Sequence, residues 1–168
     1  MNIGNIKNIT VIAICGALLF VTQAALSFLP NIEVTSLLVI LYALIFKKRV
    51  YFMIGIFVVL EGLLYGFGVW WYSYLYVWAI LAAVAMLFKN MSSVWGWAVL
   101  LATFGLAFGL LTEIPFLLIG GVTSALGFWI SGLPFDIIHC VGNFVVCAAL
   151  FKPLKSLLER LCDVALGS

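Results

Sequence analysis

Long apolar segments, separated by short polar or charged positions, make up most of this chain. The four longest stretches without Asp, Glu, Lys or Arg are residues 8–32, 62–88, 90–112 and 114–135. A helix needs about 20 predominantly apolar residues to cross the hydrocarbon core of a bilayer. No polar segment is long enough to form a soluble domain with its own core. The pattern therefore predicts an all-α fold, an integral membrane helix bundle that forms one domain over residues 1–168.

Polar boundaries divide this pattern into six expected transmembrane helices. We place them at about residues 9–29, 32–47, 50–68, 72–89, 93–114 and 134–152. The second is the shortest, because only 13 uncharged residues separate Glu33 from Lys47. A short span is tolerated here, since Glu and Lys side chains at its two ends can extend to the membrane interfaces. Residues 153–166 follow as an amphipathic cytoplasmic tail.

The basic residues all fall on one side of this arrangement. They are Lys7, Lys47, Lys48, Arg49, Lys89, Lys152, Lys155 and Arg160. Cytoplasmic loops of membrane proteins carry an excess of Lys and Arg, so both termini are expected in the cytoplasm. Without a second crossing, the cluster at residues 47–49 would move outside, so six crossings fit better than five. With 67% apolar and 8% charged residues, we expect a multi-pass protein of the cell (plasma) membrane.

A polar stripe interrupts the last predicted span. Asp136, His139, Cys140 and Asn143 follow the spacing i, i+3, i+4, i+7, which places them on one helix face. Glu61 in the third span lies at about the same depth as His139. A charge at the bilayer centre costs about 2.5–3.5 kcal/mol, so such groups normally face the bundle interior or a water-filled cavity. We therefore expect an outward-opening pocket.

Two acidic residues have a simpler alternative explanation at a helix terminus. If Pro134 occupies the first turn of the last helix, Asp136 stabilises the positive end of the helix dipole. Glu33 lies at the start of the second span, close to Asn31, where helix capping accounts for it.

The fifth span carries two glycines below an acidic residue. Gly105, Gly109 and Glu113 are spaced four residues apart and share one face. The small residues indicate close helix packing. The alternative is a bare backbone face on which a ligand lies flat.

Aromatic residues concentrate between the third and fourth spans. The segment Tyr65–Trp78 has eight aromatic residues in fourteen positions, with Gly66 and Gly68 in its turn. It fits an interfacial aromatic belt. It equally fits an aromatic wall or lid that stacks on a flat ligand.

The connection between the last two spans is unusually apolar. Residues 114–132 contain four glycines and no charged residue. Solvent-exposed loops are normally polar, so we expect a re-entrant or lid segment packed over the bundle. Trp129 is its candidate ligand contact.

Several classes of chemistry have no support in the sequence. It contains no phosphate-binding GxxxxGK loop, no HExxH and no GxSxG motif, and its single histidine cannot form a multi-histidine metal site. The few basic residues, all at the inner surface, exclude nucleic-acid binding. We expect no catalysis, cofactor or metal, and predict binding or transport of a small molecule. The candidate substrate-binding residues are Glu61, Tyr65, Trp70, Trp71, Tyr74, Trp78, Glu113, Trp129, Asp136, His139 and Asn143.

The layout resembles one transporter family over essentially the whole chain. The six-span arrangement, the outer polar and aromatic pocket and the sequence Ala-Ile-Cys-Gly-Ala at residues 13–17 are similar to the substrate-binding subunit of energy-coupling factor vitamin transporters. The Gly-Leu-Pro-Phe-Asp start and Lys-Pro-Leu end of the last span are similar too. The resemblance implies vitamin uptake from outside, powered by two partner ATPase subunits. It also implies that Ala13 and Ala17 contact the membrane-embedded coupling subunit.

The nature of the ligand follows in part from charge. Four acidic residues and no basic residue in the outer half disfavour an anion, and the aromatic residues favour a flat molecule. We expect a neutral or cationic heteroaromatic vitamin or precursor, such as thiamine, its pyrimidine moiety or pyridoxine.

Two other classes of function remain open. One is a stand-alone proton-coupled carrier with Glu61, Asp136 and His139 as a relay. The other is a structural membrane protein without a ligand.

The tail also has two interpretations. The apolar stripe of residues 154, 157, 158 and 161 either lies on the inner membrane surface or docks a partner.

Overall fold

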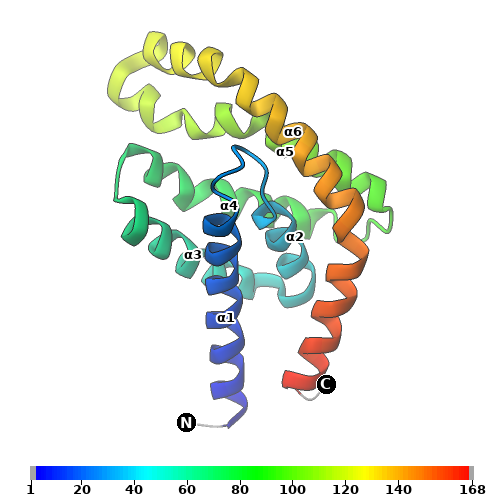
Figure 1. Ribbon diagram of the computed structural model, residues 1–168. Coiled ribbons are helices and arrows are strands. Elements are labelled where there is room, and N and C mark those ends of the chain that lie inside the picture. Colours follow the sequence, from blue (N-terminus) through cyan, green and yellow to red (C-terminus); the bar gives the residue numbers. More distant parts are fainter. Residues whose placement is uncertain (1–2, 167–168) are drawn as a thin grey trace.

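The protein is a bundle of helices, shown by a computed structural model that describes residues 3–166 (Figure 1). The elements are α1 (Ile3–Ala25), α2 (Thr35–Phe46), the 3-10 turn η1 (Lys47–Arg49), α3 (Val50–Tyr65), α4 (Val69–Leu87), α5 (Val94–Thr112) and α6 (Ile114–Leu166). Every regular element in this range is a helix, which confirms the all-α prediction. Each predicted span overlaps one helix, although α1 ends at Ala25 rather than at residue 29.

Four of the helices are long and apolar enough to cross a membrane. They contain the segments Ile6–Ala25, Val69–Leu87, Val94–Thr112 and Ile114–Ala165. The helices α2 and α3 have 12 and 16 residues and are shorter than a usual span. Several long apolar helices of this kind are typical of a membrane protein.

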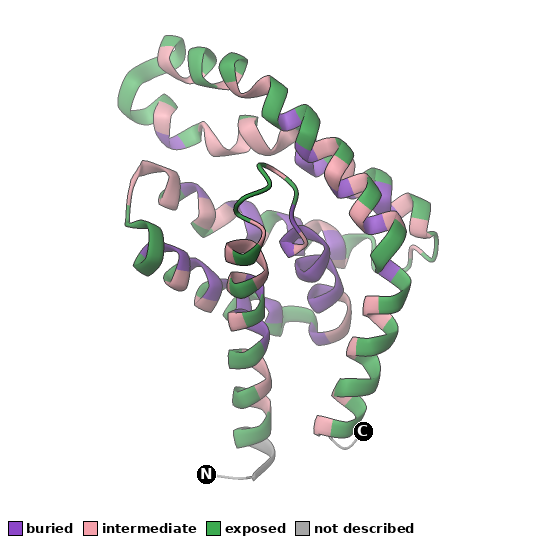
Figure 2. Ribbon diagram, in the orientation of Figure 1, coloured by how far each residue is buried: buried purple, intermediate pink, exposed green. Residues whose placement is uncertain are grey.

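The shortest α-helix lies at the centre of the bundle. Ten of the twelve residues of α2 are buried, so this helix has no exposed side, as the burial colours of Figure 2 show. Its sequence, TSLLVILYALIF, is apolar on every face, which is the pattern of a helix surrounded by other helices. The other helices, with one buried stripe each, are arranged around it.

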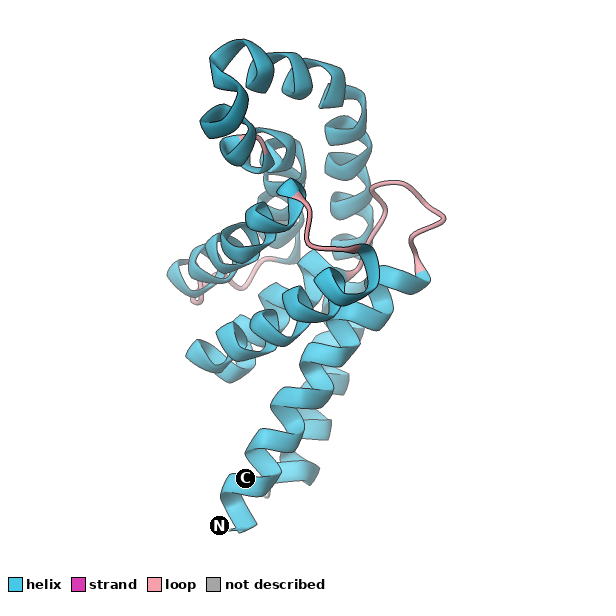
Figure 3. Ribbon diagram, turned by 90° about the vertical axis from the view of Figure 1, so that its left-hand side faces the viewer, coloured by secondary structure: helices cyan, strands magenta, loops and turns pink. Residues whose placement is uncertain are grey.

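The connection between the last two predicted spans, where we expected a re-entrant or lid segment, is helical and forms the first part of α6. Within α6 only Gly121 departs from helical geometry, with φ 71° and ψ −177°. Glycine adopts a positive φ without steric cost, so the chain reverses direction at this residue. We call residues 114–133 the arch; it extends away from the other helices in Figures 1 and 3. Inside the arch, the rings of Phe116 and Phe128 lie 5.0 Å apart.

The position of Pro134 also differs from the expectation. It lies inside α6 rather than in the first turn of a helix, so Asp136 is not at a helix N-terminus. The explanation of Asp136 by the helix dipole is therefore wrong.

Two glycines of α5 bring this helix into close contact with α6. A Cβ atom on Gly105 would lie 2.8 Å from the carbonyl carbon and oxygen of His139, and one on Gly109 would overlap the carboxylate of Asp136. Small residues at these two positions therefore allow the backbones to approach, which confirms the prediction of close packing. The alternative of a bare face for a ligand is wrong, because α6 covers it.

The tail continues α6 without a break. Leu154 and Leu158 pack against the core, whereas Leu157 and Leu161 are 51% and 55% exposed. The tail thus has apolar residues on two faces, and it ends on the same side of the molecule as the N-terminal end of α1 (Figure 1).

Candidate functional site

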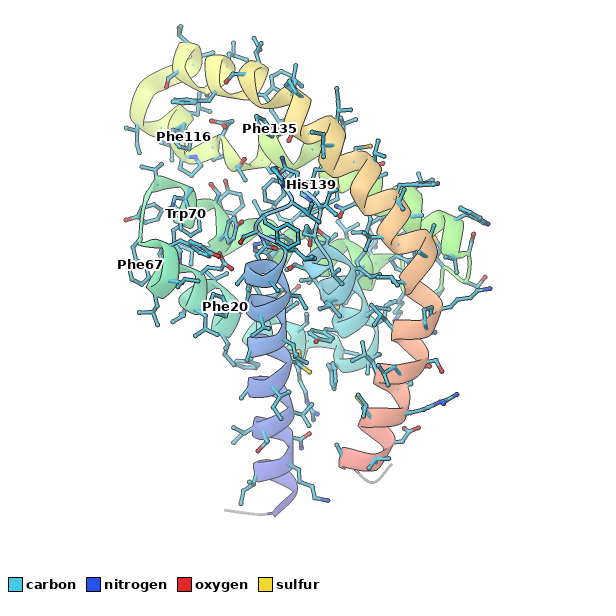
Figure 4. All side chains as sticks on the ribbon, viewed as in Figure 1. Phe20, Phe67, Trp70, Phe116, Phe135 and His139 are labelled. Carbon is cyan, nitrogen blue, oxygen red and sulfur yellow. The ribbon has the colours of Figure 1, made fainter. Side chains whose placement is uncertain are left out.

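A cavity of about 340 Å³ lies between the α1–α2 connection, α3, α4, α5 and α6. We call it the polar cavity. Its lining residues are Gln23, Leu26, Ser27, Leu29, Pro30, Asn31, Ile32, Glu33, Glu61, Tyr65, Trp70, Tyr74, Trp78, Phe108 and His139. Two of them, Trp70 and His139, are labelled in Figure 4, and they come from α4 and α6. This volume is within the range of natural small-molecule sites.

One side of the polar cavity is formed by a buried acid–imidazole pair. The Nε2 atom of His139 lies 3.2 Å from Oε1 of Glu33, and both residues are less than 10% exposed. The other carboxylate oxygen of Glu33 accepts a hydrogen bond of 2.7 Å from the backbone N–H of Ser36 in the first turn of α2. The ring of Phe108 meets the imidazole edge to face at 4.9 Å. The pair therefore joins the α1–α2 connection to the middle of α6.

Three residues that line the cavity each have one buried polar atom that makes no hydrogen bond to another described residue. The atoms are Oε1 of Glu61, Nε1 of Trp78 and Nδ1 of His139. A buried polar group without a partner costs about 1–3 kcal/mol, so native proteins rarely leave several of them together. Both hydrogen-bond acceptors and donors are present, since a carboxylate accepts and an indole N–H donates. These three residues make the wall of the cavity partly polar.

Aromatic rings form the opposite side. Tyr74 packs edge to face against Trp70 at 5.1 Å and against Trp78 at 5.6 Å. Phe57, behind this wall, meets Trp78 at 5.6 Å and is fully buried. These contacts hold the rings in fixed orientations. A ligand therefore loses less binding free energy to the ordering of these side chains.

Six of the predicted site residues line the polar cavity together. They are Glu61, Tyr65, Trp70, Tyr74, Trp78 and His139. The aromatic segment thus contributes both a wall and an exposed rim, because Phe67 and Tyr72 are more than half exposed. Trp71 is not part of the wall: its indole N–H donates to the carbonyl oxygen of Val58 at 2.9 Å.

The other predicted residues lie outside the polar cavity. Asp136 accepts a hydrogen bond of 3.0 Å from the backbone N–H of Gly109, and Asn143 donates to the carbonyl oxygen of Leu101 at 3.3 Å. Both side chains are therefore used in α5–α6 contacts, although the polar stripe faces inward as predicted. Glu113 and Trp129 each have a buried polar atom without a partner, but neither lines the cavity.

Some lining residues were missed by sequence reasoning. Glu33 was interpreted as a helix cap. One oxygen of its carboxylate does accept a hydrogen bond from the first turn of α2, but the second oxygen meets His139. Gln23, Asn31 and Phe108 carry no distinctive signal, because single polar residues near a span end and single aromatic residues within a span are common. The only available signal was the density of polar residues between positions 23 and 33.

The charge of the cavity wall is acidic. Glu33 and Glu61 provide two carboxylates, His139 provides one imidazole, and no Lys or Arg is among the lining residues. The wall is thus complementary to a neutral or positively charged molecule rather than to an anion. Comparisons of the chain with protein-family models, with curated proteins and with solved structures found no match.

Proposed function

We propose that this chain is the substrate-binding subunit of an energy-coupling factor importer and captures a small neutral or cationic heteroaromatic molecule from outside the cell. The observation that carries the proposal is the polar cavity, which is lined by Glu61, Trp78 and His139, three residues that each have a buried polar atom without a partner among the described residues. An assembly protein without a ligand would normally pair such groups within the protein.

The proposed arrangement in the membrane has six crossings with both termini in the cytoplasm. The two short helices are compatible with this, because α2 is about 18 Å long but is surrounded by protein rather than lipid. The cluster Lys47–Arg49 follows α2, at the end directed toward the two termini (Figure 1). The polar cavity then opens toward the outside of the plasma membrane. The tail extends α6 beyond one membrane surface, since the helical residues 122–166 that follow the reversal at Gly121 are far longer than one span.

The cavity supports a flat ligand with hydrogen-bond donors. Tyr74 and Trp70 offer aromatic surface, on which a heteroaromatic ring stacks and a cation is attracted to the ring faces. The carboxylate of Glu61 accepts hydrogen bonds from N–H groups. Thiamine and its pyrimidine moiety combine a ring with N–H donors, and pyridoxine combines a ring with O–H donors.

The proposed contact with the coupling subunit lies on α1. Gly16 faces α3, because a Cβ there would lie 2.8 Å from Cβ of Ile56. Ala13 is exposed and Ala17 is half-buried, so small residues are available to a helix outside the bundle. The two ATPase subunits of such an importer would supply the energy.

Ligand capture can be tested by purifying the chain from cells grown in rich medium and identifying bound small molecules by mass spectrometry. We expect a heteroaromatic compound to co-purify and to be lost from Glu61→Gln. Glu113→Gln is the matched control, because this acid also has a buried oxygen without a partner but does not line the cavity. Equal retention of the compound by both variants, or no compound in the native protein, would argue against the proposal.

Proteoliposomes that contain this chain alone distinguish the importer subunit from a stand-alone carrier. A subunit binds the ligand but does not accumulate it without ATPase partners. Accumulation of the identified ligand under a pH gradient, by this chain alone, would instead establish the proton-coupled carrier.

A further inference from the structure

A second cavity lies beside the end of α2, away from the polar cavity, and none of its lining residues is shared with it. We call it the basic groove; its volume is about 860 Å³. It is lined by Ala43, Leu44, Ile45, Phe46, Lys47, Lys48, Arg49, Met86, Lys89, Glu159, Cys162 and Asp163. The groove thus lies between the end of α2, the end of α4 and the tail of α6. The proposed solute capture does not use it.

The charges in the basic groove are mainly positive. Lys47, Lys48, Arg49 and Lys89 line it together with only two carboxylates, an excess of two positive charges. One of these carboxylates, that of Glu159, is already paired with Lys155 on the tail at 3.6 Å. The guanidinium of Arg49 donates to the neutral side-chain oxygen of Asn8 at 2.8 Å, so this contact leaves its charge uncompensated. An anionic group is therefore the complementary ligand.

The rest of the groove wall is apolar. Residues 43–46, at the end of α2, and Met86, near the end of α4, provide hydrocarbon surface next to the cations. A basic rim above an apolar wall is the pattern that binds an amphiphile with a negatively charged head. A small soluble anion would not contact the apolar part of the groove wall.

Two further cavities lead from the basic groove along the bundle. A neighbouring cavity shares Leu44, Ile45, Lys89 and Glu159 with it and also contains Met91. Met91 in turn lines an apolar groove of about 430 Å³ between α4 and α5, which reaches Leu81 and Ala107. Polar surface is almost absent there, since Thr103 is the only side chain with a hydroxyl group. A hydrocarbon chain that passes Lys89 and Met91 therefore reaches an apolar groove along the two helices, although the cavity in between is also lined by polar residues such as Asn90 and Ser92.

We propose that the basic groove binds the phosphate head of an anionic phospholipid of the inner leaflet, with an acyl chain lying between α4 and α5. Lys47, Lys48 and Lys89 contact the phosphate, and the end of α2 contacts the glycerol region. This site depends on the proposed placement of the termini in the cytoplasm but not on the identity of the imported molecule. It would anchor the bundle at a fixed depth and tilt in the membrane.

Native mass spectrometry of the protein released from nanodiscs tests the proposal. The nanodiscs contain phosphatidylcholine with a minority of phosphatidylglycerol, and the measured quantity is the number of phosphatidylglycerol molecules that remain bound. The test variant is Lys47→Gln, Lys48→Gln, Lys89→Gln. We expect its apparent affinity for phosphatidylglycerol to fall about 100-fold, since each lysine near a membrane contributes about 1 kcal/mol. Thermal unfolding of the variant in detergent is measured to check that it is folded.

The matched control removes three other cations on the same side of the protein. Lys7→Gln, Lys152→Gln, Arg160→Gln causes the same loss of charge, but none of these residues lines the groove. We expect this control to retain phosphatidylglycerol like the native protein. Equal loss from both triple variants would show a nonspecific effect of surface charge and overturn the site. Displacement of the lipid by equimolar sn-glycerol 3-phosphate would overturn it too, because the groove would then bind a soluble phosphate compound.

Discussion

The close approach of α5 and α6 at Gly105 gives the most direct test of the geometry. In Gly105→Ala the new Cβ lies 2.8 Å from two backbone atoms of His139 and 2.9 Å from the backbone nitrogen of Cys140. Backbone atoms cannot rotate away as a flexible side chain does. The two helices must therefore separate by several tenths of an ångström, since contacts of a Cβ are normally longer than about 3.4 Å.

The magnitude follows from two opposing terms. Overpacking of this kind costs about 1–3 kcal/mol. Replacing Gly by Ala in a helix raises the stability by about 1 kcal/mol, because Ala has the higher helix propensity. We thus expect Gly105→Ala to lower the free energy of unfolding by up to about 2 kcal/mol. The control is Gly55→Ala in α3, where a Cβ would meet nothing within 4 Å. It should gain about 1 kcal/mol, because only the propensity term applies.

The assay is equilibrium unfolding of both variants in the same detergent, followed by circular dichroism. The difference between them isolates the helix contact, because the propensity term is common to both and cancels. We expect a difference of about 1–3 kcal/mol. Two equally stable variants would show that α5 and α6 are not in backbone contact at this position. Because the carbonyl of His139 is displaced, Gly105→Ala should also weaken ligand binding, whereas Gly55→Ala should not.

Three further predictions address the site and its partner. A double-mutant cycle of Glu33→Ala and His139→Ala should give a coupling free energy of about 0.5–3 kcal/mol in thermal unfolding, because the two side chains are in direct contact; additive effects would show that they are independent. Asp136→Ala should lower the free energy of unfolding by about 1–3 kcal/mol, since it removes the side-chain acceptor of the Gly109 N–H and leaves a gap between α5 and α6. Asp136→Asn keeps the acceptor and should preserve both stability and ligand binding. A loss of ligand binding in a stable Asp136→Asn protein would instead place this residue in the site. Ala13→Trp should leave ligand binding intact but abolish ATP-driven uptake in the assembled importer, whereas Ala83→Trp, exposed on α4, should affect neither; equal uptake by both variants would exclude Ala13 from the contact.

The sequence predicted the helical framework well because hydrophobic segments of membrane length leave few alternatives. Charged residues at 33, 47, 89 and 113 mark helix ends to within a few residues. The arch was missed because glycine is ambiguous in apolar sequence. Gly127 and Gly132 lie within regular helix, and only Gly121 adopts the positive φ that reverses the chain.

The site was predicted in part, and the errors have one physical origin. Helical spacing correctly predicted that Asp136, His139 and Asn143 share a buried face. It could not show what covers that face, because this depends on how closely a neighbouring helix approaches. The glycines of α5 bring its backbone to Asp136, and Asn143 bonds to the same helix. Only His139 remains beside the cavity.

Glu33 illustrates the complementary error. A residue with an adequate local explanation is easily assigned to that role alone. A carboxylate has two oxygens, and here one satisfies the first turn of α2 while the other reaches a residue more than a hundred positions away. A contact between residues so far apart in the sequence leaves no periodic pattern from which it could be predicted.

The shared use of Glu33 has a mechanical consequence. A ligand that forms a hydrogen bond with His139, or that replaces His139 at Oε1 of Glu33, changes the position of the Glu33 carboxylate. The same carboxylate accepts a hydrogen bond from Ser36 in the first turn of α2. Because α2 contacts α1, α3, α4 and α6, a small displacement of its first turn also shifts the helices packed against it. Binding of a molecule in the polar cavity would thereby be transmitted along α2 to its other end, at Lys47–Arg49.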